Sequence, residues 1–220
     1  MPSPQYPRLL HVLPAFLIIV SSLLIILTHS FKPPTSPTVS WPTYSDPHGF
    51  SFTYPPTLTI SQDATSTTIS HSLPFIHPNP CNFAGLTQEN IPELIDFHVT
   101  FSLENHPLID TIIDQHGVPW FMANHVIDSS LQISPGFIDP VTIGSLSGYK
   151  ITQGVEGCGN YTYYFSLGTS RTLVVIREMI PQFSGAVADV DTYLALPGVI
   201  KPDQEDYLFA RILSTFKFTP

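Results

Sequence analysis

Apolar and polar residues alternate over several short stretches of the chain, which is the pattern of β-strands with one buried face. The longest such run extends from Ile95 to Leu103, where an apolar residue stands at every second position. Two turn sequences, Asp63-Ala64 and Gly168-Thr169-Ser170, each separate a pair of β-prone segments. These segments are Thr57–Gln62, Thr65–Ser70, Tyr161–Leu167 and Thr172–Ile176. The chain is therefore predicted to contain antiparallel hairpins.

A further strand is predicted from Phe50 to Tyr54, with three aromatic side chains on one face. The sequence Asp46-Pro47-His48-Gly49 precedes it and is typical of a turn, because proline presets φ and glycine accepts backbone angles that other residues resist. Pro55 and Pro56 end the strand, because proline has no N–H to donate to a neighbouring strand.

Helical patterns are fewer. Leu108 to Ile113 carries an apolar stripe, with Asn105 as the expected N-cap and Gly117 as the expected end. A second helix is predicted from Asp203, as its cap, to Ile212.

The rest of the pattern completes the fold class. Phe216 to Phe218 returns to alternation and predicts a short final strand, whereas Leu73–Pro80 and Ser134–Pro140 are predicted to be proline-broken loops. Strands that are not separated by regular helices favour an α+β domain, with a mainly antiparallel sheet flanked by helices.

The amino-terminal part of the chain departs from this alternation. Leu9 to Leu27 is a continuous apolar run without a formal charge, flanked by Arg8 and Lys32. At about 1.5 Å per residue, a helix over this run covers nearly the roughly 30 Å of a bilayer's hydrocarbon core. The alternative is a cleaved signal peptide, since Thr28 and Ser30 are small. The run is longer than the roughly 7–15 apolar residues of such a signal, which favours one transmembrane helix.

This helix organises the rest of the chain. Arg8 and the amino terminus together outweigh Lys32, so the positive-inside rule places the carboxyl-terminal part outside the cytoplasm. The predicted parts are a short cytoplasmic tail (1–8), a transmembrane anchor (9–29), a linker rich in proline, serine and threonine (30–42) and an extracytoplasmic domain (43–220). The predicted location is the cell membrane, crossed once.

The charge balance excludes one class of partner. The 220 residues include 17 acidic and 8 basic ones, which gives a formal net charge of −9, and every acidic residue follows Lys32. Such a domain is repelled by nucleic-acid phosphates. We therefore expect no nucleic-acid partner, and contact with the membrane only through the amino-terminal helix.

The two ends of the predicted domain carry a family pattern. Its residues are Trp41, Thr43, Tyr44, Gly49, Phe50, Ser51, Phe52, Tyr54 and Pro55, followed by Ile212 to Phe218. This pattern resembles small membrane-anchored bacterial proteins of unknown function whose soluble domain is PsbP-like. The resemblance implies an antiparallel sheet flanked by helices. It also implies an accessory or binding role, because PsbP-like domains are known mainly as binding proteins rather than catalysts, although a fold alone does not decide function.

No spacing in the sequence indicates a cofactor, a metal or a catalytic nucleophile. The histidines match no zinc-binding motif. The run Gly144-Ser145-Leu146-Ser147-Gly148 has leucine where a nucleophile would stand. Gly154 to Gly159 lacks the lysine of a phosphate-binding loop. The sequence therefore favours a protein that is not an enzyme and holds no cofactor and no metal.

Cys81 and Cys158 are the only cysteines, and both lie in the domain predicted to be outside the cytoplasm. Oxidising compartments permit disulfides, and two cysteines allow one intramolecular pairing. Both are predicted to lie in loops rich in glycine or proline, where the backbone can adjust to the geometry of a bridge. A disulfide is predicted, and two unrelated buried thiols are the alternative.

The tyrosine-rich segment after Cys158 has two interpretations. Alternation places Tyr161 and Tyr163 on one face of a strand and Tyr164 on the other. Packing in the core is the first interpretation. A partner surface that includes Tyr161, Tyr163 and Tyr164 is the second.

These expectations combine into one functional hypothesis. The chain is predicted to be a membrane-anchored extracytoplasmic binding or accessory module of the cell envelope, without catalytic activity. Its expected partner is an unidentified protein or envelope ligand. The alternative is a cell-envelope hydrolase or another envelope enzyme, which should show clustered acids or histidines with perturbed pKa values in one cleft.

Overall fold

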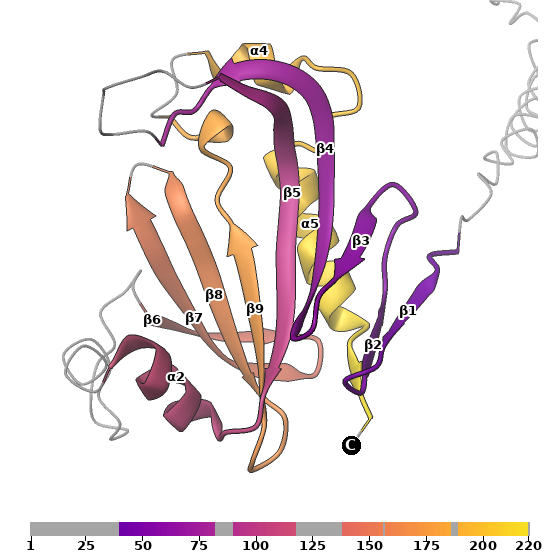
Figure 1. Cartoon of the computed structure of the whole chain (residues 1–220), viewed down its shortest axis with the longest axis vertical. Coiled ribbons are helices and arrows are strands. Elements are labelled where there is room, and N and C mark those ends of the chain that lie inside the picture. Colours follow the sequence, from indigo (N-terminus) through magenta and orange to yellow (C-terminus); the bar gives the residue numbers. More distant parts are fainter. Residues whose placement is uncertain (1–39, 82–89, 118–137, 156, 186–188, 220) are drawn as a thin grey trace, which may run out of the picture. The chain divides into compact units, whose positions relative to one another are not determined.

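Seven antiparallel strands form the main sheet of the computed structural model (Figure 1). The structure describes residues 40–81, 90–117, 138–155, 157–185 and 189–219. The predicted tail, the predicted transmembrane anchor and most of the predicted linker lie outside these residues. Within the described part of the chain, no helix has the length and apolar character to cross a membrane. Trp41–Pro220 form one compact unit.

The main sheet has the strand order β3-β4-β5-β9-β8-β7-β6. Its strands are β3 (Thr59–Gln62), β4 (Ser66–Pro78), β5 (Asn90–Glu104), β6 (Ile138–Ile143), β7 (Leu146–Val155), β8 (Cys158–Ser166) and β9 (Thr172–Glu178). Each neighbouring pair is antiparallel. A smaller antiparallel sheet contains β1 (Thr43–Asp46), β2 (Phe50–Thr53) and β10 (Lys217–Phe218).

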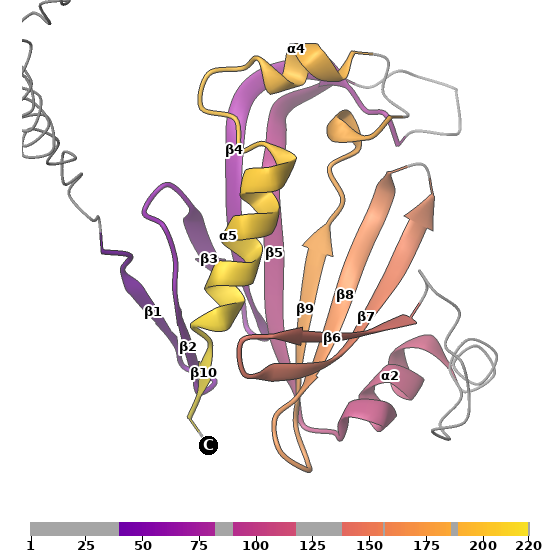
Figure 2. The ribbon, with the colours of Figure 1, turned by 180° about the vertical axis from the view of Figure 1, so that it is seen from behind.

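Helices accompany these sheets, so the predicted α+β class with a mainly antiparallel sheet is confirmed. They are α2 (Leu108–His116), the 3-10 turn η1 (Pro181–Phe183), α4 (Val190–Leu194) and α5 (Pro202–Ser214). The view from behind in Figure 2 shows α5 in front of the main sheet. The amphipathic sequence of α5 turns Phe209, Ile212 and Leu213 into the core while Ala210 and Arg211 stay exposed.

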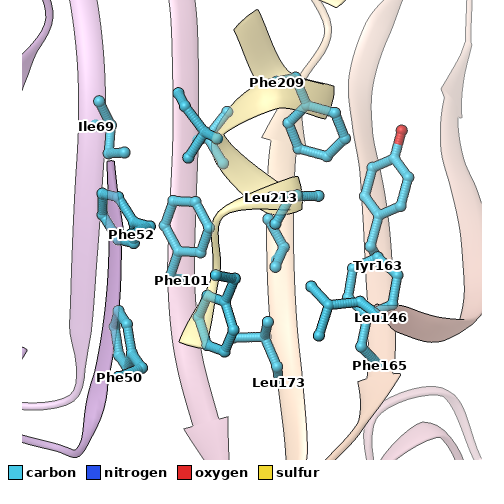
Figure 3. Packing of buried hydrophobic residues seen from close by; sticks show 14 of the residues in the cluster. Phe50, Phe52, Ile69, Phe101, Leu146, Tyr163, Phe165, Leu173, Phe209 and Leu213 are labelled. Atoms are coloured by element: carbon cyan, nitrogen blue, oxygen red, sulfur yellow. The ribbon is translucent and has the colours of Figure 1, made fainter. Parts of the chain in front are cut away.

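The larger hydrophobic core lies between the main sheet, α5 and the small sheet. Figure 3 shows Phe52 and Phe101 beside each other, with Leu213 and Phe209 of α5 between them and Tyr163. The rings of Phe52 and Phe101 stack with their centroids 5.0 Å apart. Burying each such side chain contributes about 1.5–3 kcal/mol, so the aromatic alternation of β2 fixes the small sheet against the large one.

A second core lies on the opposite face of the main sheet. There α2 contributes the buried Ile112, which packs with Ile138 of β6, Ile151 of β7 and Tyr164 of β8. The sheet is therefore covered by α5 on one face and by α2 on part of the other. The alternation within β8 decides which of its tyrosines belongs to which face.

Most predicted strands are present. The hairpin around Asp63-Ala64 is confirmed as β3 and β4, and the hairpin around Gly168-Thr169-Ser170 is confirmed as β8 and β9. The predicted strands at Phe50 and at Phe216–Phe218 appear as β2 and β10.

Four predictions about loops and helix starts were wrong. The last three residues of the predicted loop Ser134–Pro140 belong to β6, and its other residues lie outside the described part of the chain. The predicted loop Leu73–Pro80 belongs largely to β4, which tolerates its prolines because its register with β5 is irregular between Pro74 and His77. The first helix begins after Pro107 rather than being capped by Asn105. The second begins at Pro202 instead of being capped by Asp203, because proline fits the first helical position, where its missing N–H has no partner to lose.

The predicted alternation in β5 was wrong at one end. Phe97, Val99 and Phe101 are buried as expected, but Ile95 is 47% exposed. A register shift pairs His71 with Phe97 and then Ser72 with Ile95, so one extra residue of β5 stands in the ladder. The bulge moves Ile95 to the face opposite the main core.

The main sheet separates into two arms at its upper end in Figure 1, one formed by β4 and β5 and the other by β7 and β8. β5 pairs with β9 only from Val99 to Glu104, so within the described residues the stretch 90–98 has no β9 partner. The chain that follows Glu178 stays beside β8, where the Met179 N–H donates to the Gly159 carbonyl at 2.8 Å.

A disulfide between Cys81 and Cys158 connects the two arms, and the predicted bridge is confirmed. Cys81 follows β4 and Cys158 begins β8, two strands that are separated by β5 and β9 in the sheet order. The bridge brings their Cα atoms within 5.6 Å. It therefore holds together the region of the sheet where the clefts described below are found.

Candidate functional site

A cleft of about 440 Å³ opens beside the end of β9, on the face of the sheet that α5 covers. We call it the tyrosine cleft. The residues that define it are Lys150, Tyr161, Tyr163, Arg177, Glu205 and Asp206. The chain after β9 contributes Ile180, Phe183 and Ser184 to its wall. The cleft thus combines aromatic rings with charges of both signs.

Its floor is an ion pair between strand and helix. Arg177 of β9 donates from Nε to one carboxylate oxygen of Glu205 at 2.6 Å and from Nη2 to the other at 2.5 Å. The same Nη2 donates to Asp206 at 2.6 Å. The side chains of Arg177 and Glu205 are almost fully buried, whereas that of Asp206 is 70% exposed. Bidentate pairing of this kind fixes both planes and is the strongest form of the contact.

Burial acts against both members of this pair. It lowers the pKa of Arg177 when taken alone, but the hydrogen bonds and charges of Glu205 and Asp206 outweigh it and raise that pKa. Burial also raises the pKa of Glu205, and the Arg177 guanidinium opposes that rise. The guanidinium of Arg177 therefore stays charged, and the carboxyl group of Glu205 stays paired with it.

The two tyrosines of the cleft differ in exposure. Tyr163 is 6% exposed, and its ring lies 4.8 Å from that of Phe209. Burial raises the pKa of Tyr163, and the neighbouring Arg177 moderates the rise. Tyr161 is half-buried, with Lys150 Nζ 5.7 Å and Arg177 Cζ 5.9 Å from its ring centroid. Tyr161 is therefore the more accessible ring of the cleft, and Tyr163 is the more deeply buried one.

Tyr164 takes no part in this cleft, so the predicted partner surface loses one of its three tyrosines. It is fully buried on the other face of the sheet, where its hydroxyl donates to Gln115 Oε1 at 2.7 Å. His116 Nε2 lies 2.8 Å from the Tyr164 hydroxyl oxygen. The physical reason is the alternation of β8, which places neighbouring side chains on opposite faces.

The carboxylates of the cleft do not form a free acid pair. Glu205 has both oxygens occupied by Arg177, and Lys150 lies 3.2 Å from Asp139. Among the described residues, no group of three or more metal-ligating side chains is close enough to hold an ion. Chemically, the arrangement presents a ring, an exposed carboxylate at Asp206 and fixed charges, which suits binding of a polar group.

Sequence reasoning missed Arg177, Glu205 and Asp206. Arg177 stands 28 residues before Glu205, and a strand and a helix bring them together only through the fold. Tyr161 and Tyr163 were found because a cluster of tyrosines is visible in the sequence. An arginine inside the apolar stretch Thr172–Glu178 was the one available signal, because a buried cation requires a partner.

Two carboxylate–histidine pairs outside the tyrosine cleft have structural roles. Asp96 accepts a hydrogen bond from the Ile200 N–H at 2.7 Å and lies 2.6 Å from His71 Nδ1, which ties β4 and β5 to the segment before α5. Asp46 accepts from the His48 N–H at 2.7 Å, within the turn that precedes β2. Neither pair lines the tyrosine cleft.

Asp46 also explains the composition of that turn. The Thr67 hydroxyl donates to its second oxygen, so the turn is attached to β4. Burial alone raises the pKa of Asp46, but the hydrogen bonds from Thr67 and His48 outweigh it and lower the pKa. The turn Asp46-Pro47-His48-Gly49 is therefore a structural clamp between the two sheets.

Comparison with known proteins adds little to this geometry. No protein-family model matches the chain, and no curated protein matches it. A crystal structure of a protein from Bacteroides thetaiotaomicron VPI-5482, determined at 1.50 Å, aligns with 9% identity and a TM-score of 0.39. The alignment covers 81% of this chain and 48% of that one, so this chain spans about half the length of that protein. A match at this level carries no argument about function.

Proposed function

We propose that this chain is a single-pass membrane protein whose extracytoplasmic domain is a binding or accessory module of the cell envelope, without catalytic activity. The apolar run Leu9–Leu27 supports the anchor. The disulfide Cys81–Cys158 supports a position outside the cytoplasm, because such bonds persist in oxidising compartments. The pattern at the two ends of the domain, which resembles PsbP-like modules, supports the accessory role.

The tyrosine cleft is the observation that carries the proposal. It offers the half-buried ring of Tyr161 above a fixed Arg177–Glu205 pair, with Asp206 exposed at its edge. Aromatic side chains and arginine are the residues that dominate binding energy at protein interfaces. The partner is an unidentified protein or envelope ligand that places a polar group beside Asp206 and an apolar one on Tyr161.

An envelope hydrolase is the second candidate, and one observation favours it. The cleft gathers Glu178, Glu205 and Asp206, and the pKa of Glu205 is raised by burial. A general acid must exchange its proton with the substrate, however, and both oxygens of Glu205 face Arg177. This arrangement favours binding over catalysis.

Affinity capture of the full chain from its own membranes tests the proposal. The Tyr161→Ala variant should lose partners that the wild-type chain captures, because it removes the accessible ring. Tyr207→Ala is the matched control, since Tyr207 is 57% exposed on α5 and does not line the cleft. If both variants capture the same partners as the wild type, the cleft is not the binding site. If Asp206→Asn abolishes hydrolysis of an envelope polymer, the enzyme candidate replaces the module.

A further inference from the structure

A second cleft, of about 270 Å³, lies on the other side of the segment that follows β9. We call it the isoleucine cleft. The residues that characterise it are Ile91, Glu93, Ile95, His98, Glu178 and Ile180. It is separate from the tyrosine cleft in its chemistry, and the two share only the stretch Glu178–Ile180.

The apolar wall of this cleft results from the bulge in β5. Ile95 is 47% exposed because the bulge turns it away from the main core. Ile91 and Ile180 are half-buried beside it. Exposed large apolar side chains are rare in the described domain, where only Ile76 and Tyr207 are comparably exposed. The wall is suited to a short hydrocarbon chain.

The charge of the cleft has one sign. Glu93 and Glu178 line it and are both exposed, and among the described residues no lysine or arginine lines it. The nearest basic group of the other cleft, Arg177, is neutralised by Glu205 and Asp206. Two carboxylates beside an apolar wall favour a ligand that carries a cation on a hydrocarbon stem.

His98 supplies an independent observation at the same place. Its half-buried side chain lines the cleft, and its Nδ1 is buried without a hydrogen-bond partner among the described residues. Native structures rarely leave a buried polar atom unpaired, and each instance requires an explanation. Protein atoms cover this nitrogen, so a ligand that donates a hydrogen bond would provide one only after the imidazole ring turns toward the cleft.

We propose that the isoleucine cleft binds the side chain of a lysine from a partner protein. The four-carbon stem lies against Ile91, Ile95 and Ile180. The ammonium group lies between Glu93 and Glu178, and it donates to His98 Nδ1 once the imidazole ring has turned toward the cleft. A lysine side chain has the required combination, because its stem buries along apolar surface while its charged head keeps polar contacts. This site shares Glu178 and Ile180 with the tyrosine cleft but uses neither of that cleft's tyrosines.

A second copy of the chain is a poorer source of that lysine. The chain carries 17 acidic residues against 8 basic ones, so two copies repel each other. In the described domain, Lys150 is already paired with Asp139. Lys201 and Lys217 are exposed, and self-association through either would be visible as a dimer.

Methyl NMR of the full chain, with labelled isoleucines in lipid nanodiscs, tests the proposal. The probes are n-butylammonium, which reproduces the lysine side chain, and the capped peptide Gly-Lys-Gly. Both should shift the methyl signals of Ile91, Ile95 and Ile180 and saturate in roughly the millimolar range, as expected for so few atoms. n-Butanol, butyrate and the capped peptide Gly-Gln-Gly are the matched controls and should not saturate there.

Two double variants separate local from distant electrostatics. Glu93→Gln with Glu178→Gln should weaken butylammonium binding roughly two- to thirtyfold, the range for two exposed charge contacts. Asp110→Asn with Asp114→Asn removes the same charge from the exposed face of α2 and should leave the affinity unchanged. Tyr161→Ala should also leave it unchanged, which keeps this test independent of the proposed function.

Several outcomes would overturn the inference. Equal weakening by both double variants would reduce it to general attraction of cations. Saturation by butanol or butyrate would remove the cation from the recognition. Binding of butylammonium without the lysine peptide would replace the partner protein by a small amine. A dimer that dissociates on Lys201→Gln or Lys217→Gln substitution would show that the lysine comes from a second copy of the chain and not from a partner protein.

Discussion

Arg177 on β9 and Glu205 on α5 form a two-point hydrogen-bonded ion pair that joins the last helix to the main sheet. The pair lies at the floor of the tyrosine cleft, and Phe209 is one helical turn beyond Glu205, with its ring 5.0 Å from the Arg177 Cζ. The same contact therefore orients α5 and shapes the surface that we propose for binding.

Removing one member of this pair should destabilise the fold strongly. Glu205→Ala leaves a buried guanidinium with only the exposed Asp206 as partner, and we expect a loss of about 3–5 kcal/mol in the free energy of unfolding. Urea denaturation measures it. Asp206→Asn is the control and should cost less than about 1 kcal/mol, because that carboxylate is exposed. A small loss from Glu205→Ala would mean that α5 is held by its apolar face alone.

The disulfide should stabilise the domain mainly by restricting the unfolded chain. Cys81 and Cys158 are separated by 77 residues, for which the chain-entropy model gives about 4–5 kcal/mol before strain. The double variant Cys81→Ser with Cys158→Ser should lose about 2–5 kcal/mol in the free energy of unfolding. Mass spectrometry of the denatured wild-type chain, alkylated without reductant, should find neither thiol labelled. Two alkylated cysteines would contradict the bridge.

His116 should make the stability depend on pH in a defined direction. Burial lowers the pKa of His116 below its ordinary value of 6.5 in the folded domain. As the pH falls, the unfolded chain therefore takes up the proton before the folded chain does. The stability that is present above about pH 6.5 is lost as the pH falls through the lowered pKa of the folded state.

Unfolding measured at about pH 7.5 and about pH 5 checks this direction. His116→Gln keeps an amide near the Tyr164 hydroxyl but removes the titrating ring. The variant should lose less stability than the wild type between the two conditions. The carboxylates Asp46 and Asp63 also titrate with lowered pKa values, that of Asp63 to about 2, and they contribute equally in both proteins. Identical losses would exclude His116 as the source.

The bulge in β5 predicts very different losses of stability for substitutions at two apolar residues that stand two positions apart. Phe97→Ala should cost about 3–5 kcal/mol in the free energy of unfolding, because Phe97 is fully buried in the main core. Ile95→Thr should change it by about 0.5 kcal/mol or less, because Ile95 is exposed. Thermal and urea denaturation measure both. Equal effects would mean that β5 alternates without a bulge in solution.

The same bulge shows how far the sequence predicts the fold. Alternation identified β2, β5 and both long helices, because each places most of its apolar residues on one face. β8 and β9 bury side chains on both faces and were identified from β-prone residues on either side of a turn. It does not detect one extra residue within a strand, since the number of apolar positions is unchanged. The strands β1 and β7 were missed because their residues are mostly polar or small and carry little alternation. β6 was missed because Pro140 made its first residues resemble a proline-broken loop.

The candidate site was predictable only in part. Tyr161 and Tyr163 stand in a visible cluster, and the pairing of two lone cysteines follows from their number. The partnership of Arg177 with Glu205 depends on how α5 crosses the sheet, which no local pattern specifies. Ile95 joins Glu178 in one cleft only because β9 ends at Glu178, whereas the first half of β5 extends past that end.

Site-specific photo-crosslinking in native membranes tests the binding role most directly. A photoreactive phenylalanine in place of Tyr161 in the full chain should form a defined adduct with one partner. The same group in place of Tyr207, which is exposed but outside the cleft, should not. Adducts of identical composition from both positions, or none from position 161, would contradict the proposal that the tyrosine cleft is where this domain binds.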